Sequence, residues 1–446
     1  MDLIGFLPGV GGLFWTVLST IVALSIIVAV HEYGHYIVGR WSGIHAEVFS
    51  LGFGRVLVSR VDRRGTRWQI AALPFGGYVK FLGDSNAASG KDGAAMTGMT
   101  EAERRHTMHG APLWARAATV AAGPMFNFIM AIAILFFMIL FNGVATQEPI
   151  VGSVKALPGP GQSLQVNDKI LAINGQDTPD LTAVFEVSRT LTPAPTVAFE
   201  IERDGQRMTI DGAFPFPAYV EAVTPTSAGD EAGIKPGDVI VAVDGTRIYS
   251  FDELATLARG SDGKAMTLTI WRAGSEFDLT LTPRRSDLPK ADGTFETRWL
   301  IGLQGSIGFG PQTRVPGVLE AAEIAVTQTW TAITTNLNAL YYIASGEISL
   351  CNMRSPVGIA EAAGAAASQG IESFLLLLIG LSVGVGLLNL FPIPILDGGH
   401  LVFHAWEAVT GHPPGAKAMQ VLMSFGLAII FGLMLVVFLN ETLFCG

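Results

Sequence analysis

Long apolar stretches without charged residues alternate with polar segments along this chain of 446 residues. Four stretches lack Asp, Glu, Lys and Arg, and each exceeds the roughly 20 residues that a helix needs to cross the hydrocarbon core of a bilayer. The pattern therefore predicts a polytopic α-helical membrane protein with four transmembrane helices. They cover residues 3–30, 117–146, 373–396 and 418–440.

Shorter patterns fill the segments between these spans. Residues 46–83 alternate apolar and polar positions around a turn at residues 62–65, which predicts a membrane-associated β-hairpin. Residues 84–100 are small and polar and predict a mobile linker. Residues 318–344 have helical spacing and few charges, which fits either a helix lying near the membrane or an ordinary packed helix.

The segment between the second and third spans contains a tandem repeat. Residues 150–175 end in VNDKILAING, and residues 219–245 end in IKPGDVIVAVDG. Such self-similarity indicates two copies of one small β-rich module. The copies resemble PDZ domains, the second more clearly because AGIKPGD at residues 232–238 matches the helix-capping loop of that family.

The charge distribution gives the spans an orientation. Only 15% of the residues are charged, where roughly a quarter is usual, and the mean hydropathy is +0.44. Arg and Lys concentrate in residues 36–113, so the positive-inside rule places this segment in the cytoplasm and both termini and residues 148–372 outside. The first apolar run is too long for a signal peptide, so we expect it to remain in the protein.

Composition also bears on partners and cysteine chemistry. The net charge of −10 comes without a basic patch interleaved with aromatic residues, which argues against nucleic acid as a partner. Cys351 and Cys445 both fall on the predicted outer side, where a disulfide is chemically possible, but two residues do not establish one. We therefore expect no structural role for either cysteine.

The end of the first span carries the pattern His-Glu-x-x-His. On a helix, His31 and His35 lie on one face, one turn apart, where two imidazoles can bind one Zn²⁺ ion. Glu32 can then reach water at the metal and act as a general base. Ionisable residues in an apolar span are costly and therefore usually functional, although these residues could merely mark the cytoplasmic end of the helix.

A catalytic zinc site normally has three protein ligands and one open position. Asp397 is the candidate third ligand, because the prolines and paired glycines of NLFPIPILDGG break the third span and let the carboxylate turn inward. The alternative is a helix-ending aspartate in solvent. His400 and His404 are also four residues apart, but no further acidic residue stands beside them to complete a second metal site.

Taken together, these motifs resemble bacterial site-2 proteases of the regulator-of-sigma-E protease type. The resemblance runs nearly end to end, through HEYGH at 31–35, LPFGGYV at 73–79, AGPMFN at 122–127, SPVGIA at 355–360 and NLFPIPILDGG at 389–399. It implies an intramembrane zinc metalloprotease in which His31, His35 and Asp397 hold one zinc ion and Glu32 is the general base.

The same resemblance implies a partner and a location. The substrate would be a single-span anti-sigma factor that another protease has already trimmed outside, so that the cut belongs to regulated intramembrane proteolysis. The protein would be a multi-pass protein of the bacterial inner membrane. Its active site would lie towards the cytoplasmic side, and its PDZ-like domains would lie in the periplasm and filter substrates by size.

Four further residues are candidates for substrate binding or support of the active site. The resemblance places Asn127 and Asn389 close to the active site, where they assist substrate handling; packing between spans is the alternative for both. Gly76 and Gly77 belong to the predicted hairpin. Its strands can pair with the backbone of a substrate helix that has unwound locally.

These elements predict an order of domains. Residues 1–35 form the first span with the metal motif, 36–112 a cytoplasmic loop with the hairpin and linker, 113–146 the second span, 147–215 and 216–285 the two PDZ-like domains, 286–372 an outer connecting region with helices, 373–400 the third span, and 401–446 a loop with the fourth span.

Two other classes of function compete with a protease. A non-enzymatic membrane scaffold would present PDZ-like domains to chain termini and use metal only for structure, but structural zinc usually has four ligands, often cysteines. A transporter would show broken helices in two matching halves, and the sequence has no such internal symmetry. The sequence therefore favours an intramembrane metalloprotease.

Overall fold

The computed structural model describes residues 8–84, 98–159, 164–290 and 295–443, and it contains two compact units. The helical unit consists of Met1–Phe136, Ala322–Tyr341 and Met353–Gly446, and the β-rich unit of Phe137–Ala321 and Tyr342–Asn352. Most of the predicted linker at residues 84–100 lies outside the described residues.

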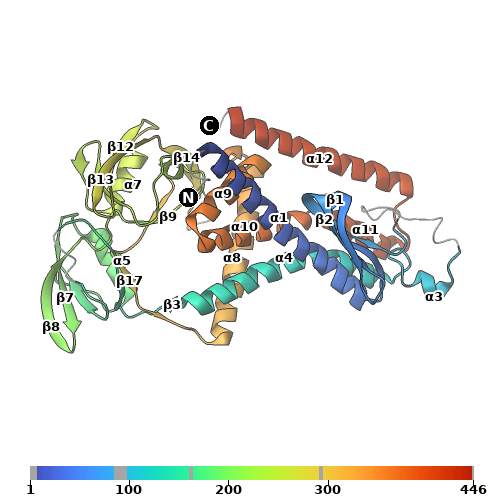
Figure 1. Ribbon diagram of the computed structural model, residues 1–446, viewed down its shortest axis with the longest axis horizontal. Helices are drawn as coiled ribbons and strands as arrows, with labels where there is room; N and C mark the ends of the chain where they lie inside the picture. The colour runs from blue at the N-terminus through green and yellow to red at the C-terminus, as the bar shows by residue number, and fades with distance from the viewer. Residues whose placement is uncertain (1–7, 85–97, 160–163, 291–294, 444–446) are drawn as a thin grey trace, which may run out of the picture. The chain divides into compact units, whose positions relative to one another are not determined.

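Four long apolar helices run through the chain (Figure 1). They are α1 (Pro8–Trp41), α4 (Leu113–Asn142), α10 (Ile371–Asn389) and α12 (Ala416–Leu443). Each is long and apolar enough to cross a membrane, so the predicted four spans are confirmed by length and composition. The first helix continues past residue 30 to Trp41, which keeps the pattern His-Glu-x-x-His helical.

Helix α9 (Pro356–Gln369) packs along α1 in the helical unit (Figure 1). Small residues let the two backbones approach, since a Cβ on Gly364 would lie 2.9 Å from the Cα of Thr16. The hydroxyl of Thr20 also donates to the carbonyl of Ala360 at 3.3 Å. Close backbone packing and interhelical hydrogen bonds are what hold helices together where lipid replaces water.

The start of α9 is tied to α12. Ser355 caps α9 by accepting the N–H of Gly358 at 3.3 Å, and Pro356 takes the first helical position. Glu441 of α12 accepts the N–H of Ser355 at 2.9 Å. A carboxylate is favoured at a helix N-terminus by the helix dipole, so the SPVG motif connects these two helices.

A bent antiparallel hairpin follows α1, as the sequence predicts. It consists of β1 (Ala46–Val61) and β2 (Arg67–Phe81). Because both strands bend, residues 46–51 pair on one side with residues 77–81 and on the other side with residues 67–70. Residues 77–81 therefore form one outer edge of this small two-stranded sheet.

A small apolar core fixes the hairpin beside the end of α1. Tyr36, Phe49, Val79 and Phe81 are all buried in it. The rings of Tyr36 and Phe49 meet edge to face, with centroids 6.0 Å apart. This core holds the outer edge at residues 77–81 next to the helix that carries His31 and His35. The short helix α3 (Glu101–Arg104) follows the hairpin in the chain.

The β-rich unit contains two β modules, each with a four-stranded sheet of the same strand order. In each, a buried aspartate makes two bonds to an arginine: Asp168 to Arg203, both at 2.7 Å, and Asp238 to Arg272, at 2.6 and 2.7 Å. The tandem repeat in the sequence thus corresponds to a repeat in topology and in this ion pair.

The first β module comprises β4 (Val151–Val154), β5 (Lys169–Ile173), β6 (Gln176–Asp177), α5 (Leu181–Thr190), β7 (Val197–Arg203) and β8 (Gln206–Gly212). The second β module comprises β9 (Val220–Val223), α6 (Ala228–Glu231), β10 (Val239–Val243), β11 (Thr246–Arg247), α7 (Phe251–Arg259), β12 (Met266–Arg272) and β13 (Ser275–Leu281). The strand orders of the two sheets are β6-β5-β7-β8 and β11-β10-β12-β13. A separate hairpin of β14 (Arg284–Pro289) and β15 (Phe295–Leu300) comes next.

Strands from beyond both modules return to complete them. β16 (Leu303–Gly305) pairs with β9, and β17 (Phe309–Pro311) pairs with β4. The second β module is therefore inserted into the first. Finally, β18 (Thr313–Arg314) pairs with β3 (Val144–Ala145) and forms a two-stranded neck where the chain enters and leaves the modules.

The two β modules contact each other through aromatic and polar side chains. Phe216 lies between Phe185 of α5 and Phe251 of α7, with ring centroids 6.3 and 5.8 Å away. Lys155 of the first module bonds to the carboxylate of Glu221 and to the hydroxyl of Ser306. These contacts link the modules into one body.

Helix α8 (Val318–Ser345) follows the neck and exposes large apolar side chains. Leu319, Trp330 and Tyr341 are 86%, 65% and 68% exposed, which favours the alternative of a helix near the membrane over an ordinary packed helix. Beyond it, the short helix η1 (Leu350–Asn352) contains Cys351. Cys351 is disulfide-bonded, contrary to the expectation of no structural role, and Cys445 lies outside the described residues.

Candidate metal centre

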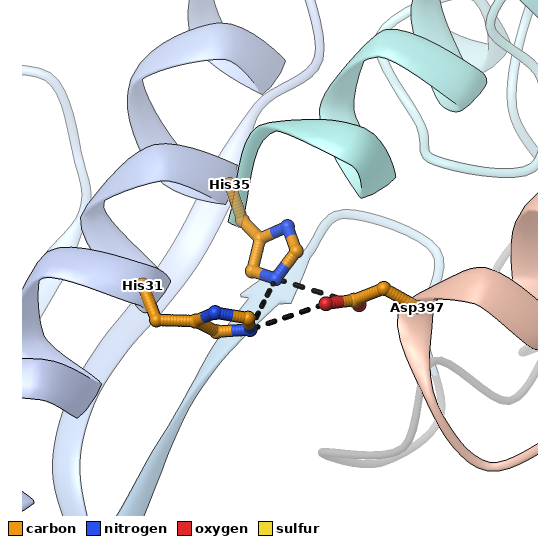
Figure 2. Close-up of side chains that lie close together, drawn as sticks. All are labelled: His31, His35 and Asp397. Atoms are coloured by element: carbon orange, nitrogen blue, oxygen red, sulfur yellow. Dashed lines mark hydrogen bonds and ion pairs between the residues drawn. The ribbon is translucent and has the colours of Figure 1, made fainter. Parts of the chain in front are cut away.

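Three predicted ligand residues converge from two helices of the helical unit (Figure 2). His31 and His35 lie one turn apart on α1, and Asp397 is the first residue of α11 (Asp397–Thr410). The Nε2 atoms of the two histidines are 3.2 Å apart. Asp397 lies 3.2 Å from Nε2 of His31 through Oδ2 and 3.5 Å from Nε2 of His35 through Oδ1.

These separations match the edges of a zinc coordination tetrahedron. Zinc binds histidine nitrogen and carboxylate oxygen at about 2.0–2.2 Å, which sets neighbouring donor atoms about 3.4 Å apart. In addition, Oδ2 of Asp397 is buried and makes no hydrogen bond. A carboxylate oxygen in that situation is expected where a cation completes the site. The donor set therefore fits one zinc ion with an open position.

The interruption of the helix before Asp397 has a local cause. Helix α10 ends at Asn389, and the following segment contains Pro392 and Pro394, which cannot continue a helix. Gly398 and Gly399 then pack directly on main-chain atoms of that segment; a Cβ on Gly399 would lie 2.5 Å from the Cα of Pro394. This folding back on itself brings the start of α11 to the histidines.

Helix α4 supports both histidines from behind. The carbonyl oxygen of Thr119 lies 2.8 Å from Nδ1 of His35, and because a carbonyl only accepts, Nδ1 carries the proton. The lone pair of His35 is then on Nε2, which faces the other ligands. On the same helix, the side-chain nitrogen of Asn127 lies 3.2 Å from Nδ1 of His31.

Gly123 allows α4 to come this close. A Cβ at this position would lie 2.5 Å from Cε1 of His35 and 2.9 Å from Cε1 of His31, nearer than real Cβ contacts. Pro124 follows it and lacks the N–H that would bond the carbonyl of Val120, so the hydrogen-bond ladder of α4 is interrupted here. The helix is thus shaped to lie directly against the imidazoles.

Glu32 faces the same pocket, which has a volume of about 330 Å³. Val79, on the outer edge of the hairpin, donates its main-chain N–H to Glu32. Gly77 lies on that edge as well, and a Cβ there would be 3.2 Å from Cγ of Glu32. Glu32 therefore lies between the three candidate zinc ligands and the outer edge of the hairpin.

The other candidate residues are divided between the pocket and its surroundings. Asn389 and Gly77 line the pocket, whereas Asn127 and Gly76 do not. Gly76 has φ +122°, a conformation that favours glycine, and its α-carbon faces the ring of Phe53. Asn127 is fully buried behind His31.

His400 and His404 line the pocket but do not form a second metal group. In the part of the chain that the structure describes, only His31, His35 and Asp397 form a group of three metal-binding side chains. Arg116, held by Glu407 through two bonds of 2.9 and 2.7 Å, also lines the pocket. Burial lowers the pKa of His404 to about 4, so it is neutral at pH 7.

Sequence reasoning missed two residues that support the centre, Thr119 and Gly123. The signal for them was the spacing: Thr119, Gly123 and Asn127 are each four residues apart and therefore lie on one face of α4. The sequence alone did not indicate which residues this face contacts.

A comparison with protein-family models matches residues 19–433 to the model described as peptidase family M50. The chain is also similar to curated proteins over nearly its whole length. A protein of Agrobacterium fabrum named "Putative zinc metalloprotease" is 35% identical over 98% of this chain and 96% of its own length.

A second protein of the same descriptive name, from Rhizobium meliloti, is 36% identical over 95% of each chain. The regulator of sigma-E protease of Escherichia coli is 32% identical over 96% of this chain and 98% of its own length.

Gly123→Ala should displace the imidazoles and weaken zinc binding. We expect about a 10- to 100-fold loss of zinc affinity, the range seen when the surroundings of a metal ligand are disturbed. Zinc affinity is measured by competition with a chelator on purified protein. Gly380→Ala in α10 is the control, because a Cβ there meets no atom within 4 Å. Equal zinc affinity of the two variants would contradict the packing described here.

Proposed function

The chain belongs to peptidase family M50, and on that premise we propose that this zinc metallopeptidase cuts peptide bonds inside the membrane, within the spanning segments of single-span proteins. One observation carries the proposal: two of the three zinc-binding donors lie on α1, a helix that is long and apolar enough to cross a membrane. Membership in a peptidase family also sets aside the alternative of a non-enzymatic scaffold.

Zinc bound by His31, His35 and Asp397 supplies Lewis-acid activation of water and of the peptide carbonyl. Glu32 accepts a proton from the attacking water while the water oxygen forms a bond to the carbonyl carbon. Glu32 then gives that proton to the leaving nitrogen as the C–N bond breaks. The N–H of Val79 donates to Glu32 and holds its carboxylate in place for both transfers.

A substrate helix must unwind before it is cut, because its peptide bonds are otherwise hydrogen-bonded within the helix. The outer edge of the hairpin lies beside Glu32 at Gly77 and Val79. Among the residues that the structure describes, β2 pairs with no strand other than β1. An extended substrate segment that pairs with this edge would satisfy its own N–H and C=O groups. It would also present its backbone to Glu32 and the zinc ligands.

The substrate class follows from the relatives. One relative is named regulator of sigma-E protease, which supports an anti-sigma factor as the substrate of this chain as well. We propose that the anti-sigma factor is first trimmed on the outer side by another protease. The Arg- and Lys-rich segment at residues 36–113 supports an inner-membrane orientation with the active site towards the cytoplasm and the β modules in the periplasm.

The two β modules act as PDZ-like domains that restrict access to the active site. Their contacts through Phe216 and Lys155 make them one body rather than two independent domains. The neck of β3 and β18 lies where the chain enters and leaves them. A rigid body attached in this way can exclude substrates that carry bulky outer domains while it leaves the chemistry to the helical unit.

Glu32→Gln should abolish proteolysis and leave zinc bound. The amide does not accept a proton, whereas His31, His35 and Asp397 remain, so we expect activity to fall by about 10²- to 10⁴-fold or more. Cleavage of a co-expressed single-span protein and zinc content of the purified variant are measured together. Cleavage at the original rate would remove Glu32 as the base.

His31→Ala, His35→Ala and Asp397→Ala should each reduce both zinc content and activity. Each change removes one of three donors, so we expect zinc to fall from about one ion per chain to a small fraction of that value. His404→Ala is the control, since His404 lines the pocket outside the donor group. A full zinc content in Asp397→Ala would place the third ligand elsewhere.

Removal of the β modules at the neck should allow cleavage of untrimmed substrates. The N–H of Thr146 bonds to the carbonyl of Gln312 at 2.8 Å, so a short Gly/Ser linker can replace residues 147–311 without separating β3 from β18.

We expect zinc binding to persist in this deletion variant and the untrimmed substrate to be cut. The same deletion with Glu32→Gln is the control for cleavage by other proteases. A stable, zinc-containing deletion variant that still requires trimmed substrates would contradict the filter.

A further inference from the structure

We propose that Asn127 is a positioning residue for the zinc ligand His31 and does not contact substrate. Its side-chain oxygen accepts a hydrogen bond from the Nδ1–H of His31 and thereby holds the ring in the tautomer whose Nε2 can bind zinc. This inference rests on the proposed function, because it assigns a partner to one of the proposed zinc ligands.

The location of Asn127 separates it from the substrate. The residue is fully buried, with 0% of its surface exposed, and it does not line the pocket that contains Glu32 and the donor group. Its amide group instead meets the rear of the His31 ring, 3.2 Å from Nδ1. A residue on this side of the ring acts on the metal ligand and not on a peptide in the pocket.

The chemistry of His31 decides which end of the amide faces Nδ1. If the amide nitrogen donates to Nδ1, the ring proton is on Nε2, and that nitrogen has no lone pair for a metal. Yet Nε2 is the atom that lies 3.2 Å from both His35 and Asp397. Zinc binding therefore requires the proton on Nδ1 and an acceptor next to it.

Asn127 can supply that acceptor with a half turn of its amide group. The two ends of the amide have nearly the same shape, so the turn requires no repacking. The side-chain oxygen of Asn127 makes no hydrogen bond in its present direction although it is buried. After the turn, it accepts the Nδ1–H of His31 at the same 3.2 Å separation.

The arrangement then becomes the same for both histidines. His35 already donates Nδ1–H to an oxygen of α4, the Thr119 carbonyl, and points Nε2 to the metal position. His31 would do the same with the Asn127 oxygen, two turns further along α4. A hydrogen-bond acceptor behind each metal-binding histidine fixes the ring and makes it a stronger ligand.

Packing between helices is the competing role for Asn127, and the structure assigns it to a different part of the residue. Ser382 of α10 donates its hydroxyl to the main-chain carbonyl of Asn127 at 2.8 Å. The Cβ of Asn127 also faces Gly386 of α10. Contacts with α10 therefore use the backbone and Cβ, whereas the amide group is directed at His31.

The test compares Asn127→Leu, Asn127→Asp and Ser382→Ala in the full-length protein. Leu has nearly the shape of Asn but no acceptor, so we expect zinc affinity to fall about 10- to 100-fold, measured by chelator competition. Asp keeps an acceptor oxygen and should retain zinc affinity within a few-fold of the original protein. Ser382→Ala removes the bond to the Asn127 backbone and should leave zinc affinity unchanged.

Kinetics with saturating zinc separate positioning from substrate contact. A positioning role predicts a lower kcat at similar KM in Asn127→Leu, with rescue in Asn127→Asp. Normal zinc affinity of Asn127→Leu together with a raised KM would overturn the proposal in favour of substrate binding. If Asn127→Leu aggregates on size-exclusion chromatography, Asn127→Ala replaces it. The proposal is then overturned if Asn127→Asp binds zinc no more tightly than Asn127→Ala does.

His31→Ala distinguishes this inference from the proposed function. Full zinc affinity of His31→Ala would mean that the proposed zinc site itself is wrong. Loss of zinc in His31→Ala, with unchanged zinc affinity in Asn127→Leu, would reject only the role of Asn127.

Discussion

The close approach of α4 to α1 at the two histidines is the contact on which the rest of the site depends. Gly123 on α4 and Gly34 on α1 both lack the side chain that would hold the helices apart; a Cβ on Gly34 would lie 2.5 Å from the carbonyl oxygen of Ala122. At this distance the main chain of α4 can accept a hydrogen bond from His35 directly. Two flexible imidazoles are thereby held in place on a rigid scaffold, as precise metal binding requires.

A polar centre among apolar helices is stable only if each of its groups has a partner. An unpaired polar or charged group away from water is costly, and metal, main chain and neighbouring side chains are the partners that remain there. Here α4 supports the histidines, the break before α11 delivers Asp397, and the hairpin edge contacts Glu32. In the proposed mechanism, the hairpin edge beside Glu32 would give an unwound substrate the partners that its own backbone loses.

The β-rich unit is completed by strands that come late in the chain. Strands β16 and β17 return to the modules after the chain has passed through both, so neither module is complete until the chain comes back to the neck. The aromatic row around Phe216 then joins the two modules. The proposed size filter requires such a joined pair, since two freely moving domains would not define a size limit.

The sequence by itself determined the four spans, the hairpin, the repeat, and the residues His31, Glu32, His35 and Asp397 as candidates, because apolar length, alternation and the spacing of ligands are local properties of a chain. The tertiary structure decided what local patterns do not contain. It brings Asp397 within 3.5 Å of the histidines and places Thr119 and Gly123 against them. It also places Asn127 behind His31 and outside the pocket, and it completes both modules with strands beyond residue 300. Each of these depends on which helix faces or strand edges meet, and that choice is made by packing between segments far apart in the sequence.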